Sequence, residues 1–245
     1  MNGSAIETAI IALRNEVSVE IANTPALLRE AHRLRHQVYC VERAFETGQD
    51  GLERDQYDDH ARHAVVRWRQ TGEVVGAVRL ILPETPAGGG ALPIHHVCDR
   101  ALLRDVPATT GEVSRFALAR QLTKQVRSIS PASSSLLRLA LIQGAVRLSA
   151  EAGHTHWLAV MEPTLLRLLA ATGLHFTPLG PTVEYHGLRQ PAVAELVPVL
   201  ARLAIERPVV WDFITRDGTW YPASRPRGPR FPRVIRAPLK ETVAA

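Results

Sequence analysis

The run Gly111-Glu112-Val113-Ser114-Arg115-Phe116-Ala117-Leu118 is typical of a β-strand, yet it places Glu112 and Arg115 among apolar and small residues. A charged side chain inside a buried strand needs an opposite charge beside it, because an unpaired buried charge is very costly. A second such run, Gly76-Ala77-Val78-Arg79-Leu80, holds an arginine in the same setting. The sequence therefore predicts a sheet in which charged side chains meet and neutralise one another.

Upstream of these charges, the sequence predicts strands and one long helix. An alternating run at 17–21 is followed by a helix that begins after Thr24 and continues to about Arg43. Two β-like runs, 61–70 and 73–82, are joined at Thr71-Gly72, which is typical of a hairpin.

Downstream, Ser130-Pro131 opens a helix that ends at Gly153. The further elements that we expect are a strand at 154–161, a helix at 164–172, a strand or hairpin at 174–186 and a helix at 191–206. The resulting order, β-α-β-β-β-α-β-α-β-α, predicts the α/β (α+β) class, with one mixed sheet and helices on both of its faces.

The bulk composition is that of a soluble globular protein. The chain of 245 residues is 46% hydrophobic and 22% charged, and no apolar run is long enough to cross a bilayer. Met1 to Asn15 lacks the basic-then-apolar order of a signal peptide, and Cys40 and Cys98 are too few for a disulfide scaffold. We therefore expect a cytoplasmic protein, with residues 1–222 as a single domain and 223–245 as a basic, proline-rich tail.

The net charge of +5 is concentrated in this tail. From Arg225 onward six basic residues accompany one acid, so residues 1–224 have no net charge. A neutral body argues against a nucleic-acid partner, which usually meets a basic face of the fold. Arginines recur every three residues from Arg227 to Arg236 and would line one edge of a polyproline II helix. Such a ribbon would contact an acidic carrier protein or an anionic membrane surface; a solvated, unstructured tail is the alternative.

Several common chemistries lack their motif in this chain. There is no G-x-x-x-x-G-K-[ST] phosphate loop, no G-x-G-x-x-G after a strand and no G-x-S-x-G nucleophile elbow. His60-x-x-His63 and His95-His96-x-Cys98 do not have the spacing of zinc sites, so we expect no metal. Nucleotide hydrolysis, nicotinamide chemistry and serine-hydrolase chemistry are therefore disfavoured.

Charged and aromatic residues recur in four ordered segments. Arg35 and Tyr39 are four residues apart and share a face of the first helix. The segment 53–58, an E-x-D-x-x-D cluster, would supply carboxylates to the arginines, and we infer a charged network at one end of the sheet. The candidate residues that organise a site or bind substrate are Arg35, Tyr39, Phe45, Glu53, Asp55, Asp58, Arg79, Ser114, Arg115 and Phe116.

In this order and spacing, R-x-x-x-[FY], E-x-D-x-x-D, G-x-x-R-L and E-x-S-R resemble the acyl-homoserine-lactone (autoinducer) synthases, a GNAT-like group. The second half of the chain is similar to the acyltransferases associated with exosortase/PEP-CTERM systems and to the related N-acyl amino acid synthases. This similarity is found in the runs 162–169, 173–176 and 180–191, the last of which ends in H-G-x-R-x-P. The whole resemblance covers roughly residues 15–205.

The resemblance implies a sheet splayed between its fourth strand, 112–119, and its fifth, 154–161, with the phosphopantetheine arm of a carrier in the gap. Ser133 and Ser134, near the start of the helix expected after the fourth strand, would receive the phosphate. The chain lacks the glycine-rich turn by which many acetyltransferases hold the diphosphate of coenzyme A. Acyl carrier protein is therefore the expected acyl donor and acyl-CoA the second choice, and no permanently bound cofactor is expected.

Acyl transfer from a thioester to a small amine needs few groups. Glu112 is the candidate base, directly or through a water, and backbone N–H groups of the splayed strand would hold the oxyanion. Asp55 or Asp58 would bind the amine as a cation, and Tyr185 or His186 would protonate the leaving thiolate. A structural reading stays open for all of them: the acids would then only pair with arginines, and Tyr185 and His186 would be hydrogen-bonded strand residues.

The leading function is an N-acyltransferase that joins a long acyl chain to an amino acid or a similar amine. One alternative is a homoserine-lactone synthase that uses S-adenosylmethionine, although the H-G-x-R-x-P half of the chain favours the exosortase-associated group. Another is a non-catalytic module that binds an acylated carrier or a lipid. A nucleic-acid binder is the weakest alternative.

Overall fold

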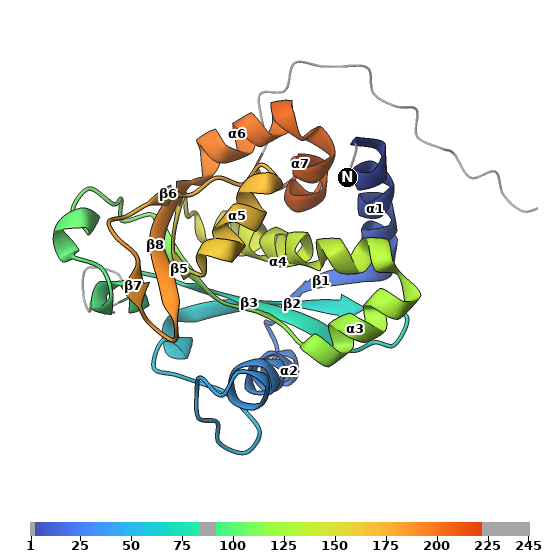
Figure 1. Cartoon of the computed structure of the whole chain (residues 1–245), viewed down its shortest axis with the longest axis horizontal. Helices are drawn as coiled ribbons and strands as arrows, with labels where there is room; N and C mark the ends of the chain where they lie inside the picture. The colour runs from blue at the N-terminus through green and yellow to red at the C-terminus, as the bar shows by residue number, and fades with distance from the viewer. Residues whose placement is uncertain (1–2, 84–91, 222–245) are drawn as a thin grey trace, which may run out of the picture.

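The computed structural model describes residues 3–83 and 92–221, so the basic tail and its expected contacts lie outside the described residues. The described chain is a mixed sheet with helices on both faces (Figure 1). The elements are α1 (Gly3–Glu16), β1 (Val17–Ile21), α2 (Pro25–Arg35), η1 (His36–Glu42), η2 (Asp58–His60), β2 (Ala61–Trp68), β3 (Val74–Ile81), η3 (Pro93–His96), η4 (Arg100–Leu103), β4 (Thr110–Leu118), α3 (Arg120–Ile129), α4 (Pro131–Ala152), β5 (His156–Met161), α5 (Pro163–Ala171), β6 (Thr177–Pro178), β7 (Val183–Glu184), β8 (Leu188–Glu195), α6 (Leu196–Glu206) and α7 (Pro208–Thr215).

Within the described residues, the sheet has eight strands in the order β1-β2-β3-β4-β5-β8-β6, with β7 paired to β8. Neighbouring strands are antiparallel except for β4 and β5, which are parallel. β4 pairs with β5 only from Thr110 to Glu112, although β4 continues to Leu118. The two strands therefore separate after Glu112, and the predicted class, a GNAT-like mixed and splayed sheet, is confirmed.

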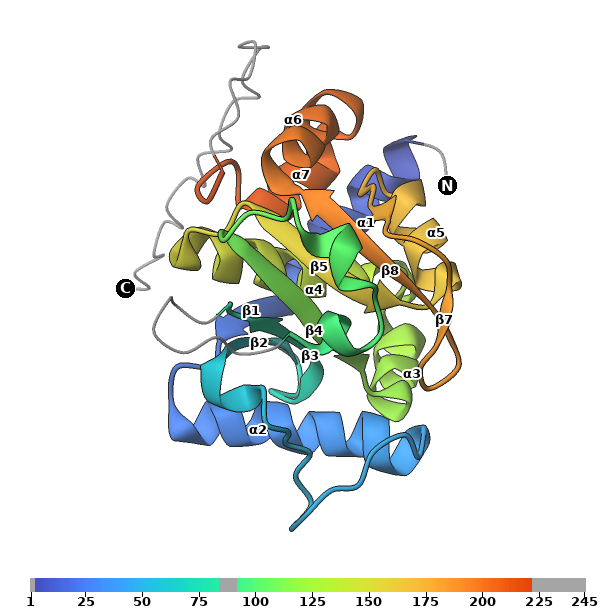
Figure 2. The same cartoon turned by 90° about the vertical axis from the view of Figure 1, so that its left-hand side faces the viewer.

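The helices cover the two faces unequally. α2 lies on one face, whereas α4 crosses the other and is surrounded there by α1, α5, α6 and α7 (Figures 1 and 2). α4 packs directly on β1, β2 and β3. The approach is close at Gly144, where a Cβ would lie 2.8 Å from the Cβ of Ala64. Among the described residues, no helix combines the length and apolarity needed to span a bilayer.

The helix expected from Thr24 to about Arg43 is present, but its last part is not α-helical. The Thr24 hydroxyl accepts a hydrogen bond from the N–H of Leu27 at 3.2 Å, and Pro25 occupies the first helical position. From His36 to Glu42 the backbone is π-helical. Short π-helical stretches are uncommon and often lie at functional sites, and this one leads into the loop that contains Phe45.

The helix expected at 191–206 is wrong in its first half. Leu188–Glu195 forms β8, which pairs with β5 along the whole length of that strand. The helix begins only at Leu196, and Pro198 lies in its first turn. Proline is tolerated in a first turn because the N–H groups there have no intrahelical acceptor. Pro198, and not Pro191, is therefore the proline that marks this helix start.

Other differences concern elements that the sequence did not predict. Helices α1, α3 and α7 were not expected, and the run 174–186 contains only the two-residue strands β6 and β7. The turn at Thr71-Gly72 is present, but the full loop between β2 and β3 is residues 69–73. Of these, α3 bears most on function, because it directly follows β4 in the place expected for the helix that begins at Pro131.

Candidate active site

A cavity of about 350 Å³ lies where β4 and β5 separate. One part of its wall is apolar and comes from β4, β5, α4, α5 and Phe176; it includes Phe116, Leu118, Ile142, Trp157, Leu165 and Leu169. The other part is charged and aromatic, and it includes Tyr39, Phe45, Asp55, Glu112, Arg115 and Tyr185. The cavity is thus lined by both apolar and charged side chains.

Beside the polar part, three arginines and three carboxylates alternate in a closed ring. Arg35, which is fully buried, donates to Glu53 and bidentately to Asp58, at 2.6 and 2.9 Å. Arg79 donates to Asp55 and, at 2.8 Å, to Asp58.

Arg115 closes this arginine–carboxylate ring by donating to Glu53 at 2.8 Å and to Asp55 at 3.0 Å. It also donates to Glu46 at 2.9 Å, and the Nε of Arg79 donates to the Ser114 hydroxyl at 3.0 Å. The charged network predicted from the sequence is confirmed. It fixes the acidic loop before β2 against β3 and β4.

The ring holds its carboxylates in their ionised form. Burial alone would raise the pKa of Glu53, Asp55 and Asp58, but the hydrogen bonds and charges of the arginines outweigh it, and each pKa lies below its usual range. Carboxylates with a lowered pKa stabilise the fold above about pH 4, and this contribution is lost as the pH falls toward their folded pKa values.

Glu112 lies outside the ring, at the point where β4 and β5 separate. It is 2% exposed, and its Oε2 accepts the N–H of Ile94 at 2.9 Å. Burial raises the pKa of Glu112 to about 7, although the Ile94 N–H and the charges of Arg79 and Arg115 oppose this rise. A carboxyl group with such a pKa exchanges its proton near neutral pH, as a general base must.

β4 is irregular where it borders the cavity. Arg115 has a φ of 48°, and the register between β3 and β4 shifts between Ala77 and Arg79. A non-glycine residue in this left-handed region is strained, and such strain often marks a functional site. Beyond Glu112, none of the described strands pairs with β4 on the β5 side, so backbone there borders the gap.

The aromatic residues predicted from the sequence all line the cavity: Tyr39, Phe45, Phe116 and Tyr185. The Tyr39 ring lies 5.2 Å from the guanidinium carbon of Arg115. Burial raises the pKa of Tyr39 and of Tyr185, so both hydroxyls keep their proton at neutral pH. A protonated Tyr185 is compatible with its predicted role as an acid, which stays a prediction.

Ser133 and Ser134 are not among the residues that line this cavity, and their expected contact with phosphopantetheine stays a prediction. Ser133 is fully buried at the start of α4, and the hydroxyl of Ser134 donates to the carbonyl of Pro131 at 2.9 Å. The expectation assumed that α4 is the first helix after β4. That helix is α3, and its first amide, the Arg120 N–H, donates to the carboxylate of Glu42 at 3.0 Å.

Sequence reasoning considered His186 only beside Tyr185, as an acid for the leaving thiolate, and it assigned no role to Arg43, Glu162 or Arg189. All four residues line the cavity. Three of these four residues lie within the runs 162–169 and 180–191 on which the resemblance rests. The sequence signal that could have identified Arg189 is its position shortly after Tyr185, a candidate site residue, and the His186-Gly187 pair.

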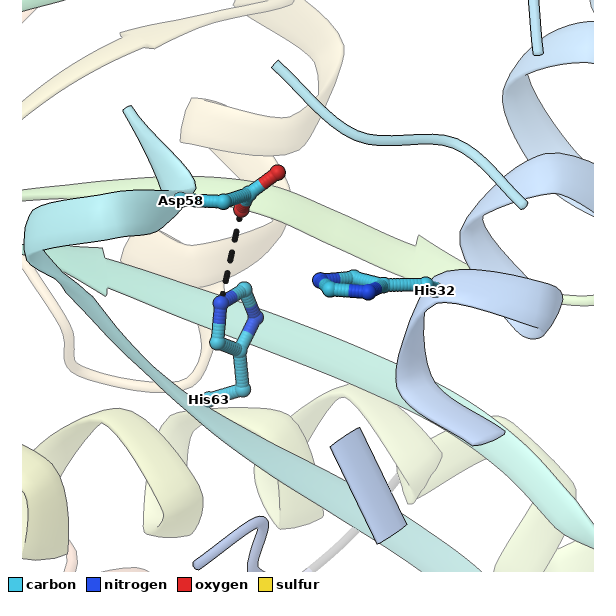
Figure 3. A group of neighbouring side chains, drawn as sticks. All are labelled: His32, Asp58 and His63. Atoms are coloured by element: carbon cyan, nitrogen blue, oxygen red, sulfur yellow. Dashed lines mark ion pairs between the residues drawn. The ribbon is translucent and has the colours of Figure 1, made fainter. Parts of the chain in front are cut away.

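Asp58, a member of the ring, also forms a group with His32 and His63 (Figure 3). Their candidate ligand atoms all lie within 4.8 Å of one another, which is metal-like spacing. Both Asp58 oxygens already accept two hydrogen bonds each, from Arg35, Arg79 and the Asp55 N–H. A carboxylate oxygen has two lone pairs, so Asp58 has none left for a cation. We interpret this group as structural.

The buried histidines predict a loss of stability in mild acid. Burial and the charge of Arg35 lower the pKa of His63 to about 3, so below pH 6.5 the unfolded chain binds a proton that the folded chain does not. At pH 5 this difference destabilises the fold by about 2 kcal/mol relative to pH 7. His63→Gln is expected to remove the part of the decrease in unfolding free energy that His63 causes. Urea unfolding at pH 5 and pH 7 measures this decrease. The same change at exposed His175 is the control, and equal pH dependence in both variants would contradict the prediction.

A mixed sheet that is splayed between two parallel strands is a GNAT-like fold. Comparisons with known proteins agree with this class. Residues 34–127 match the family model of the acetyltransferase (GNAT) domain. No curated protein matches the sequence.

Solved structures of acyl-homoserine-lactone synthases have a similar fold. The synthase LasI has a TM-score of 0.56 and 21% identity, covering 75% of this chain and 93% of its own. BjaI, a CoA-dependent acyl-homoserine lactone synthase solved with SAM and isopentyl-CoA, has a TM-score of 0.56 and 23% identity, covering 88% and 95%. FeeM, an N-acyl amino acid synthase from uncultured soil microbes, has 14% identity, covers 76% and 94%, and with a TM-score of 0.49 is too distant to support an inference. The domain match and the shared fold support an acyltransferase.

Proposed function

We propose that the protein is an N-acyltransferase that moves a long acyl chain from an acyl carrier protein thioester to the amine of an amino acid or a similar small amine. The observation that carries this proposal is the position of Glu112. This buried carboxyl group, with a pKa raised to about 7, lies on a cavity that is lined by both apolar and charged side chains. Amine acylation needs both an apolar compartment for the chain and a proton acceptor beside the thioester.

The reaction forms a bond between the amine nitrogen and the thioester carbonyl carbon and breaks the carbon–sulfur bond. Glu112 takes the proton of the attacking amine, directly or through a water, and Tyr185 donates its proton to the leaving thiolate. The proton on Glu112 then returns to Tyr185 through solvent. Backbone N–H groups of β4 beyond Glu112 hold the oxyanion of the tetrahedral intermediate.

Asp55 is a better candidate than Asp58 for binding the amine as a cation. Asp55 lines the cavity, and its side chain is 21% exposed, against 3% for Asp58. Its Oδ2 accepts one hydrogen bond, from Arg115, and keeps a lone pair for an ammonium group.

The hydrogen bond that the first N–H of α3 makes with Glu42 favours a carrier-bound donor over coenzyme A. The N-terminus of a helix is a common seat for phosphate groups. At α3 this amide is bonded to the Glu42 carboxylate, and a negative charge there disfavours a diphosphate. The similarity of 162–191 to exosortase-associated acyltransferases supports the same assignment. In this proposal residues 1–222 are one cytoplasmic acyltransferase domain, and the basic tail contacts the acidic carrier or an anionic membrane.

A second candidate is a homoserine-lactone synthase, which the likeness of the fold to LasI and BjaI favours. To separate the two, the full chain is incubated with long-chain acyl carrier protein, or with acyl-CoA, and pooled amino acids, with and without S-adenosylmethionine. Mass spectrometry of the lipid extract is expected to detect N-acyl amino acids that do not depend on S-adenosylmethionine. Acylated lactone that requires it would instead establish the synthase, and binding of the acyl carrier without any product would establish a non-catalytic module.

A further inference from the structure

Two arginines hold one carboxylate at the charged part of the cavity. Arg43 donates to Oε1 of Glu162 at 2.8 Å, and Nη2 of Arg189 lies 3.5 Å from the same oxygen. The three residues come from the loop after η1, from the start of α5 and from β8. We call Arg43, Glu162 and Arg189 the arginine clamp; all three line the cavity that also contains Glu112.

An aromatic ring positions the clamp. The guanidinium carbons of Arg43 and Arg189 lie 5.5 and 5.9 Å from the centre of the Phe45 ring, which also stacks on His186 at 5.4 Å. Ala44, between Arg43 and Phe45, has a φ of 51°, and the Phe45 N–H donates to the carbonyl of Tyr39 at 2.8 Å. A strained backbone that is held in this way keeps the clamp in place before a ligand binds.

The ion-paired groups around the cavity form two clusters of opposite net charge. The clamp has two positive charges and one negative charge, so it has a net charge of +1. The arginine–carboxylate ring is neutral by itself, and with Glu46 bound to Arg115 it has a net charge of −1. A molecule with an ammonium group at one end and a carboxylate at the other matches this polarity.

We propose that the arginine clamp binds the carboxylate of the acceptor, and therefore that the acceptor is an α-amino acid and not a simple amine. This inference rests on the proposed function. The acceptor carboxylate makes the clamp a neutral group of two arginines and two carboxylates, and its amine is then directed toward Asp55 and Glu112. Arginine suits this role because its planar fork matches a carboxylate.

The test compares each apolar or aromatic amino acid with the amine formed by its decarboxylation, using the full chain and acyl carrier protein as donor. For the wild type, kcat/KM is expected to be about 100-fold higher with the amino acid. Arg43→Gln and Arg189→Gln are expected to raise the KM for the amino acid about 10- to 100-fold, with little change in kcat or in the reaction of the amine. Arg202→Gln, in an exposed pair with Glu206, is the matched control.

Glu162→Gln is expected to act in the opposite direction. Without the Glu162 carboxylate, the acceptor has no internal competitor for the two arginines, so the KM for the amino acid should fall. The reaction of the amine in each variant reports whether the protein is folded. Equal use of amine and amino acid by the wild type, or an equal rise of both KM values in the arginine variants, would overturn the inference and leave the proposed function standing.

Calorimetric binding of the amino acids is measured in parallel, so that the clamp can be tested without turnover. If no amine of any kind is acylated, the proposed function fails. Amino-acid binding that is lost in Arg43→Gln and Arg189→Gln would still support the clamp. Absence of amino-acid binding to the wild type would overturn it.

Discussion

Replacement of Glu112 by glutamine is expected to lower kcat about 100- to 10,000-fold, the usual contribution of a general base. Glutamine has nearly the same shape and can still accept the Ile94 N–H through its carbonyl oxygen, so the fold should be retained. The variant removes only the ability to take a proton. Steady-state kinetics with acyl carrier protein and the preferred acceptor measure the effect, with Glu206→Gln on the surface of α6 as the control.

The pH dependence gives this prediction a second readout. Glu112 acts as a base only when it is ionised, so activity should rise with pH through about 7, the raised pKa of its carboxyl group. Titration of the acceptor amine affects both proteins and cancels when the wild-type rate is divided by that of Glu112→Gln. The ratio should therefore increase across pH 7 and then become constant.

As the pH rises, the free energy of unfolding should decrease, whereas the activity should increase. Because the folded-state pKa of Glu112 is raised above the usual 4.5, its effect on stability is most favourable below pH 4.5 and is lost as the pH rises through 7. Above pH 7 the ionised, buried carboxylate destabilises the fold by about 3 kcal/mol, and Glu112→Gln should recover part of this. A variant that keeps full activity, or that loses stability above pH 7, would show that Glu112 is a structural residue.

The charged network could be predicted from the sequence because its members are recognised one at a time. An arginine in a strand such as Arg79 or Arg115 requires a carboxylate, and 53–58 is the nearest acidic cluster between the strands. The alternation of arginines and carboxylates in a ring was not predictable, because it depends on how the acidic loop folds back over β3 and β4. Pairing rules specify that partners exist, whereas tertiary packing decides which ones meet.

The errors share a different physical cause. Ser130-Pro131 correctly marked the start of α4, but the unexpected helix α3 separates that start from β4. The helix expected from Pro191 was wrong in its first half, because the pairing of β8 with β5 overrode the local preference. The arginine clamp was missed for a related reason. Arg43 lies 119 positions before Glu162, to which it donates, and only the fold brings the two together.

Arg35→Met is expected to destabilise the fold by about 3–5 kcal/mol, the cost of removing one partner from a buried ion pair. Arg35 is fully buried and pairs with both Glu53 and Asp58. Methionine fills much of the volume but leaves each carboxylate with a single arginine, Arg115 for Glu53 and Arg79 for Asp58. Urea unfolding at pH 7 measures the loss, and Arg14→Met, which breaks the exposed pair with Asp217, should cost less than about 1 kcal/mol.

As the pH falls, the difference in the free energy of unfolding between the wild type and Arg35→Met should become smaller. In the wild type the low pKa values of Glu53 and Asp58 stabilise the fold above about pH 4, and this contribution is lost as they become protonated. Without Arg35 these pKa values rise toward or above their usual range, so the variant has less of this stability to lose. A difference that stays constant from pH 7 to pH 3 would mean that Arg35 stabilises the protein by filling space and not by its charge. The ring would then not be the electrostatic brace that holds Asp55 and Arg115 at the cavity, and the position of the proposed amine site would need another explanation.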